Sequence, residues 1–456
     1  MLVIAHGIVG RADLPIPEEL FGAAAAAVLV VSFLALAAGW SEPRLEDPPE
    51  RALFWIPPAV EVLAGAIGVA VFAAVVYAGL AGTDSQQDNL APSAVYVGFW
   101  VAVPFLSLVV GDWFRLFNPW RAIGRATGWA AGRLSRGEAT EAFPYPARLG
   151  HWPAAAGILA FVICELCWAK GREPGPLAVL MLAYLFVQLA GQGVYGVETW
   201  SRRGDAFGVW FGLFAMLAPV RRTEDGRVAL RPPVAGATRL APLAGTVPLL
   251  VIGIGSTGFD GAKEGPLFNG VRPDLQELFT SLGATMGVGL ELAFVVGLLV
   301  AIAMVGALWR LGTEGMPRAG MSSPPTLDRK ELSRRFAHTL IPIAAAYVVA
   351  HYFSLLAYNG QDLWRLASDP LGDGADLFGG AGSAIDYSIL SATAIWYVQV
   401  LALVGGHVAA LVLAHDRALV VYGSPKAATR SQIVMLVLMV CFTCLGLWLL
   451  SAALNG

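Results

Sequence analysis

The residues of this sequence that are most able to carry out chemistry are a few ionisable side chains inside long apolar runs. His351 lies in the run at about 336–358, within the segment YVVAHY, and is followed directly by Tyr352. His407 lies comparably deep in the next long run. An imidazole inside hydrocarbon is costly without a partner, so such residues are functional candidates by default. We expect any reactive centre to lie around this helix pair.

Depth along the expected helices groups His351 with two carboxylates. Counting about 1.5 Å per residue places Glu165, Glu291 and His351 at one level, roughly 8–12 Å below the outer ends of their helices. Tyr352 adjoins this level, and Asp260 is expected at its outer mouth. We predict catalytic roles for these five residues. The alternative is that they only pair with one another and hold the helices together.

Two carboxylates and an imidazole at one level can bind a transition metal, move a proton, or activate a metal-bound water. A divalent transition metal is therefore the expected cofactor. Its candidate ligands are Glu165, Glu291, His351, His407 and His6. The metal's identity is left open by the sequence.

A haem held between the two histidine-bearing helices is disfavoured by residue spacing. His338 and His351 are thirteen residues apart, whereas His407 and His415 are eight apart on an antiparallel neighbour. With His338 and His415 level, His351 rises about 20 Å and His407 only about 12 Å. Axial ligands must face each other across one iron, so this mismatch separates His351 from His407.

The composition is that of an integral membrane protein. The 456 residues are 57% hydrophobic and 14% charged, whereas soluble proteins average about 45–50% apolar and 25% charged residues. The net charge is −3 and no basic block predicts a nucleic-acid partner. The sequence lacks the Gly-x-Ser-x-Gly, His-Glu-x-x-His and P-loop motifs. These absences disfavour soluble-type serine hydrolases, zincins and ATPases.

Ten apolar runs of roughly spanning length predict an all-α, polytopic helix bundle with about ten transmembrane helices. The runs are at about 20–39, 56–81, 93–113, 152–170, 176–196, 241–258, 283–308, 336–358, 387–414 and 431–453. Placing both termini outside puts 24 of the 30 lysines and arginines in inner loops. This asymmetry is what the positive-inside rule requires.

Two further segments are expected at the inner face. Residues 205–219 are apolar but too short to span, so they predict an interfacial or re-entrant helix. Residues 117–136 space tryptophan and arginine as in an amphipathic helix on an anionic leaflet. The lipid bilayer is thus the first expected partner.

The N-terminal segment 1–19 is expected to be a short outer tail before a single membrane domain at 20–456. Its first five residues lack a positive region and a full apolar region, so they are not a signal peptide. Val3 and Ala5 before His6 nevertheless fit the end of one. A plain outer tail is the favoured interpretation, and a remnant of a signal peptide is the alternative. Processing there would leave His6 as an N-terminal residue able to chelate a metal.

Four segments carry a resemblance to a known family. They are HGIVGRADLPIP at 6–17, LFNPWR at 116–121, GSTGFDG at 255–261, and WYVQV at 396–400 continuing to GH at 406–407 and HDR at 415–417. With these segments the chain resembles, over essentially its whole length, the bacterial multi-spanning membrane proteins called fenitrothion hydrolases. Members usually begin with a signal peptide that ends just before the His-Gly, and this chain departs there.

The resemblance implies hydrolysis of the P–O aryl bond of organophosphorus esters at the membrane, and we expect this to be the bacterial inner membrane, where the distribution of lysine and arginine predicts an outer N-terminus. It implies no catalytic residues. A metal held by Glu165, Glu291 and His351 would supply the nucleophilic water and the charge stabilisation. A small apolar substrate would reach an outer-half site through the bilayer. The alternative is a transporter or metal-handling permease that uses the same polar residues, and a partner subunit is compatible with either function.

Overall fold

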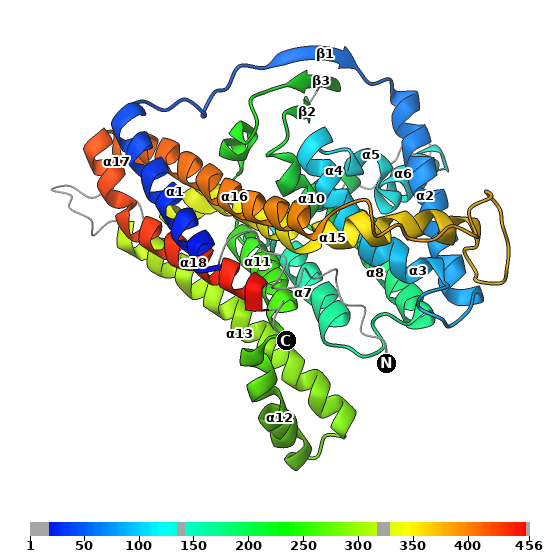
Figure 1. Ribbon diagram of the computed structural model, residues 1–456. Helices are drawn as coiled ribbons and strands as arrows, with labels where there is room; N and C mark the ends of the chain where they lie inside the picture. The colour runs from blue at the N-terminus through cyan, green and yellow to red at the C-terminus, as the bar shows by residue number, and fades with distance from the viewer. Residues whose placement is uncertain (1–17, 135–141, 224, 242, 317–328, 453–456) are drawn as a thin grey trace.

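The computed structural model describes residues 18–134, 142–223, 225–241, 243–316 and 329–452. It is built almost entirely of helices, which pack side by side around a buried centre (Figure 1). The predicted all-α architecture is confirmed at this level.

Seven helical segments of the described chain are long and apolar enough to cross a membrane. They are α1 (Glu18–Gly39), α2 (Pro58–Ala81), the continuous α3 (Leu90–Ser93), η2 (Ala94–Ala102) and α4 (Val103–Val110), α8 (Pro174–Tyr195), α13 (Met286–Gly315), the series α14 (Arg329–Phe336), η5 (Ala337–Thr339) and α15 (Leu340–Ser368), and α16 (Ala392–Tyr422). The pair α17 (Pro425–Ser431) and α18 (Ile433–Ala452) makes an eighth if its bend of 41° lies within one span.

Two of the expected spans are shorter helices at the centre of the molecule. They are α7 (Trp152–Leu166), with 15 residues, and α11 (Thr246–Ala262), with 17. At about 1.5 Å per residue they fall short of a hydrocarbon core of about 30 Å. α11 is buried along most of its length and packs against α7, α13 and α15. α11 is thus surrounded mainly by protein, and Figure 1 shows both helices near the middle of the molecule.

The apolar segment at 205–219 forms α10 (Ala206–Ala215), which follows α9 (Val197–Arg203). Trp210, Phe211 and Phe214 of α10 are among the most completely buried large side chains. The helix packs against α4, α7 and α15. The interfacial placement allowed by the sequence is therefore wrong, because bulky apolar side chains on nearly all sides of α10 need a protein environment.

The amphipathic segment at 117–136 forms α6 (Pro119–Leu134), after the short α5 (Phe114–Phe117). Its two ends differ. Trp120 and Arg121 are buried, whereas Trp129 is 63% exposed and lies under the guanidinium of Arg133 at 4.4 Å. Only the C-terminal half has the exposure expected of a membrane-surface helix.

A small antiparallel sheet joins loops that the sequence left without structure. It consists of β1 (Arg51–Trp55), β2 (Val220–Arg222) and β3 (Arg227–Leu230), in the order β1-β3-β2. Arg51 pairs with Leu230 and Trp55 with Arg227. β1 crosses the upper edge of the molecule in Figure 1 to reach the other two strands. The short helix η3 (Ala235–Arg239) follows.

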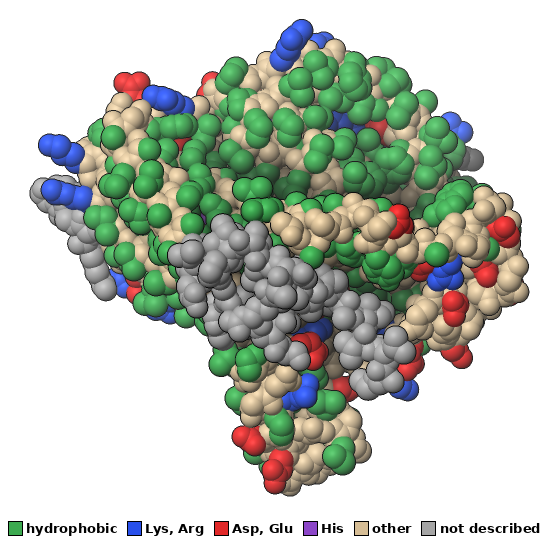
Figure 2. Space-filling view, in the orientation of Figure 1, with side chains coloured by type: hydrophobic (Ala, Val, Ile, Leu, Met, Phe, Trp, Pro, Cys, Tyr) green, Lys and Arg blue, Asp and Glu red, His purple; other side chains and the backbone are tan. Residues whose placement is uncertain are grey.

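The surface is covered by hydrophobic side chains over the body of the molecule, and charged side chains gather toward its edges (Figure 2). Val31, Val62 and Phe186, on three of the long helices, are each more than 60% exposed. Such extensive apolar exposure fits contact with lipid. The remaining helix, α12 (Pro266–Ser281), projects from the body beside the start of α13 (Figure 1).

Candidate functional site

An ionisable cluster forms where the C-terminal end of α11 meets α15, with Asp260 at its centre. The carboxylate oxygen Oδ2 of Asp260 lies 2.9 Å from Nε2 of His351. The same oxygen accepts a hydrogen bond of 3.0 Å from the hydroxyl of Tyr352. Asp260 is only 6% exposed. α11 continues to Ala262, past the end at 258 expected from the sequence, so Asp260 is inside the bundle and its predicted position at the mouth is wrong.

Lys263 is a member of this cluster that the sequence analysis did not identify. Its Nζ lies 2.8 Å from Oδ1 of Asp260, and its side chain is 14% exposed. The apolar run at about 241–258 ends before Lys263, so the sequence places this residue in an outer loop. The detectable signal was its spacing of three residues from Asp260, which places both on one face of a helix.

Glu165 was predicted at this level and is close to the cluster. It lies one residue before the end of α7 and is 8% exposed. Asp260, Arg172 and Lys263 are near enough for their charges to act on it. Its Oε2 has no hydrogen-bond partner in the described part of the chain. A carboxyl oxygen in this position is costly to keep charged.

Glu291 does not join the cluster. Its Oε1 instead accepts a hydrogen bond of 3.0 Å from the backbone N–H of Ala169, in the loop after α7. Across the described residues, no three His, Cys, Asp or Glu side chains are arranged to hold a metal ion. The expected ligand set of Glu165, Glu291 and His351 is therefore not assembled, because equal depth on separate helices does not bring side chains together. His6 lies outside the described residues.

His407 lies among different neighbours from His351. It is fully buried, its Nδ1 is 2.7 Å from the carbonyl oxygen of Leu403, and its ring faces those of Tyr347 and Phe442. Its Nε2 has no hydrogen-bond partner within the described chain. His351 and His407 were both expected to be metal ligands, but their side chains lie in two separate environments.

The segment LFNPWR has a structural role. Oδ2 of the buried Asp205 accepts hydrogen bonds from Asn118 at 2.8 Å and from Trp120 at 2.6 Å. Oδ1 accepts another from Tyr184 at 2.8 Å. These neutral donors fix α6 against α10 and α8.

The segment HDR at 415–417 has a similar role at the end of α16. The carboxylate of Asp416 accepts hydrogen bonds from the indole of Trp40 and from the backbone N–H groups of Arg44 and Leu45. It thereby holds the loop after α1 against α16. Of the resembling segments within the described residues, GSTGFDG enters the ionisable cluster, through Asp260.

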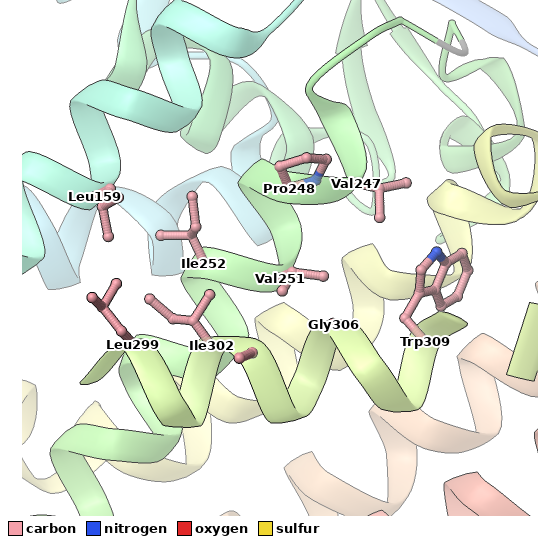
Figure 3. A pocket seen from close by; sticks show the side chains of 10 residues that line it. Leu159, Val247, Pro248, Val251, Ile252, Leu299, Ile302, Gly306 and Trp309 are labelled. Atoms are coloured by element: carbon pink, nitrogen blue, oxygen red, sulfur yellow. The ribbon is translucent and has the colours of Figure 1, made fainter. Parts of the chain in front are cut away.

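An apolar pocket of about 360 Å³ opens between α7, α11 and α13 (Figure 3). Leu159, Ile252 and Ile302 face it from the three helices. Ile252 precedes Asp260 by eight residues, which is about 12 Å along α11. The pocket therefore lies below the ionisable cluster along α11, and its lining suits an apolar molecule.

The cluster combines the parts of a general acid–base centre. A carboxylate bonded to one nitrogen of an imidazole fixes the ring's orientation. Tyr352 shares that carboxylate, and Lys263 adds a positive charge. Comparisons of the chain with family models, with curated proteins and with solved structures find no match.

Proposed function

We propose that the protein is a membrane-bound hydrolase of organophosphorus esters, with His351 as its general base. The observation that carries this proposal is the contact of 2.9 Å between His351 and the buried carboxylate of Asp260. The resemblance to fenitrothion hydrolases supplies the substrate class.

In this mechanism Asp260 orients His351 through Nε2, and Nδ1 takes a proton from a water molecule. The hydroxide formed attacks phosphorus, and the aryl oxide leaves with the electrons of the P–O bond. Lys263 supplies positive charge for the phosphoryl oxygen, where negative charge develops. Asp260 stabilises the imidazolium produced by the first proton transfer. Since the described residues offer no three-ligand metal group, every step uses side chains of the cluster.

Access through the bilayer supports an apolar substrate. The pocket of Figure 3 is lined by aliphatic side chains and Trp309, and part of this lining, Val251 and Ile252, lies on α11, the helix that carries Asp260. An aryl phosphotriester partitions into hydrocarbon, so it can reach the cluster from the lipid.

The proposed topology has ten spans and both termini outside, in the inner membrane of a bacterium. It counts the short helices α7 and α11 and the bent pair α17–α18 together with the seven long segments. The distribution of lysine and arginine supports it. The C-terminal ends of α7 and α11, with Glu165 and Asp260, then lie in the outer half.

Hydrolysis of a nitrophenyl phosphotriester by the protein purified in detergent tests the proposal directly. The His351→Gln variant is expected to lose about 10²–10⁴-fold in kcat, the usual contribution of a general base. Unchanged turnover in His351→Gln would exclude the mechanism. Turnover abolished by a chelator, and restored by one divalent metal, would replace it with a metal-assisted one.

A proton-coupled permease is the second candidate, and Glu165 favours it. A buried carboxyl whose Oε2 has no hydrogen-bond partner among the described residues, close to Asp260 and Lys263, suits alternate binding and release of a proton. Reconstitution into liposomes with a pH-sensitive dye inside tests it. Proton uptake that depends on Glu165, together with absent hydrolysis in detergent, would favour the permease over the hydrolase.

A further inference from the structure

A second cavity, of about 380 Å³, is formed by segments distant in the sequence and is rich in arginine. Its guanidinium groups come from the α4–α6 region, the end of α9 and the end of η3. They belong to Arg115, Arg121, Arg202, Arg203 and Arg239. In the proposed topology all of them lie on the inner side, away from the ionisable cluster.

The lining carries more positive than negative charge. Glu198 binds both Arg115 and Arg121, at 2.6 and 2.7 Å. Arg239 is bound by Glu50 at 2.6 Å. Asp112 is the acidic side chain of the lining itself, and Arg115, Arg121 and Arg202 lie near it.

Arg202 and Arg203 are the two remaining arginines of the lining. Among the described ion pairs neither has a carboxylate partner, and the guanidinium of Arg203 lies over the ring of Tyr145 at 5.5 Å. Both are at least partly exposed. The excess positive charge of the cavity is therefore concentrated at the end of α9.

The cavity also has an apolar wall, formed by one side of α10. Val209, Leu213 and Met216 line it together with Gly212. A Cβ atom added at Gly212 would meet nothing within 4 Å. The glycine thus leaves space in the cavity that a larger side chain would fill.

We infer that this cavity binds a phosphate-bearing ligand, with Arg202 and Arg203 on the phosphate and the α10 wall against its apolar part. Guanidinium groups match phosphate oxygens in pairs and hold them by charge-assisted hydrogen bonds. The volume is within the range of about 300–1,000 Å³ typical of small-molecule sites. The ligand is either the headgroup of an anionic phospholipid or a soluble phosphate ester.

Binding measurements on the purified full-length protein separate these sources. The probes are dihexanoyl phosphatidylglycerol, dihexanoyl phosphatidylcholine and glycerol phosphate, each titrated while the thermal unfolding midpoint is followed. Saturable stabilisation by phosphatidylglycerol alone identifies a lipid headgroup, and by glycerol phosphate a soluble ester. Either result supports the site. No saturable effect of any probe, or equal effects of phosphatidylcholine and phosphatidylglycerol, would overturn it.

Two variants locate the binding in the cavity. The Arg202→Gln/Arg203→Gln variant is expected to weaken binding by about tenfold or more, the scale of one charge-assisted hydrogen bond. Gly212→Leu fills the cavity without changing charge and is expected to weaken binding at least as much. The matched control is Arg227→Gln, an exposed arginine of β3 outside the cavity. Equal weakening by the control would assign the binding to general surface charge and overturn the inference.

Discussion

Asp205 and Asp260 are both buried aspartates between helices, yet their partners are of different kinds. Asp205 is bound by three neutral donors, the amide of Asn118, the indole of Trp120 and the hydroxyl of Tyr184. Asp260 is bound by groups that gain, lose or carry charge, among them His351 and Lys263. One carboxylate is a fixed acceptor that joins helices, and the other belongs to the cluster for which we propose acid–base chemistry.

Asp205 and Asp260 are both buried, so burial alone does not single out the aspartate that we propose as reactive. Neutral donors satisfy Asp205 without any group whose charge state changes near neutral pH. Asp260 instead contacts an imidazole, a side chain that can take up and release a proton. The partners therefore distinguish a structural from a reactive aspartate.

The largest expected effect is on activity, in Asp260→Asn. An amide at this position removes the negative charge that orients and stabilises a protonated His351, and it faces Lys263 without neutralising it. We expect kcat for aryl phosphotriester hydrolysis to fall by about 10²–10⁴-fold. Steady-state kinetics of the purified variant provide the measurement.

The matched control is Asp205→Asn, which makes the same change at the structural site. The hydroxyl of Tyr184 can turn from donor to acceptor, so an amide is tolerated there. Its kcat should stay within a few-fold of the original. Similar activity losses in both variants would contradict the distinction.

The second effect is on stability, in Asp205→Ala. Removal of the carboxylate leaves the donors of Asn118, Trp120 and Tyr184 unpaired in a buried place. At about 1–3 kcal/mol for each unsatisfied group, we expect a loss of about 3 kcal/mol or more. Chemical unfolding in detergent measures it. A loss below that of Asp205→Asn would show that the three hydrogen bonds are not what holds α6 in place.

A smaller effect should appear in the pH dependence of stability. Burial alone would raise the pKa of Glu198, but hydrogen bonds and charge from Arg121 and Arg115 lower the pKa to about 2. A carboxyl whose pKa is lower in the folded state stabilises the protein above its unfolded pKa of about 4.5. This contribution is lost as the pH falls from about 5 toward 2.

The unfolding midpoint should therefore decrease over that range, and less steeply in Glu198→Gln. The same slope in both proteins would show that this ion-pair group contributes nothing to acid sensitivity. Because the side chain of Glu198 is nearly half exposed, solvent screening keeps the expected effect small.

The smallest effect on hydrolysis is expected for Glu291→Gln. Depth along the helices grouped Glu291 with Glu165 and His351, whereas the structure places it outside the cluster, so this variant tests which grouping is right. Glu291 accepts a hydrogen bond from the backbone N–H of Ala169, and an amide oxygen can accept the same hydrogen bond. Hydrolysis should change by less than about threefold. A loss as large as that of Asp260→Asn would restore Glu291 to the catalytic group.

The sequence by itself determined the helical, membrane-type architecture and singled out His351 as an intramembrane histidine that needs a partner. Long apolar runs must form helices in lipid, since no other single-segment structure satisfies the backbone there. An imidazole at that depth must then find a partner. Both conclusions follow from local composition, without knowledge of packing.

Only the tertiary structure decided which partner His351 has. Residue counting gives depth along a helix but not rotation about its axis, so Glu291 was grouped with His351 although its carboxylate lies elsewhere. Asp260 was expected at the mouth because hydropathy ends a helix at its last apolar residue. α11 continues beyond that residue because α13 and α15 surround it and Lys263 neutralises Asp260. The burial of α10 and the pairing of β1 with β3 likewise depend on contacts distant in the chain, which composition does not encode.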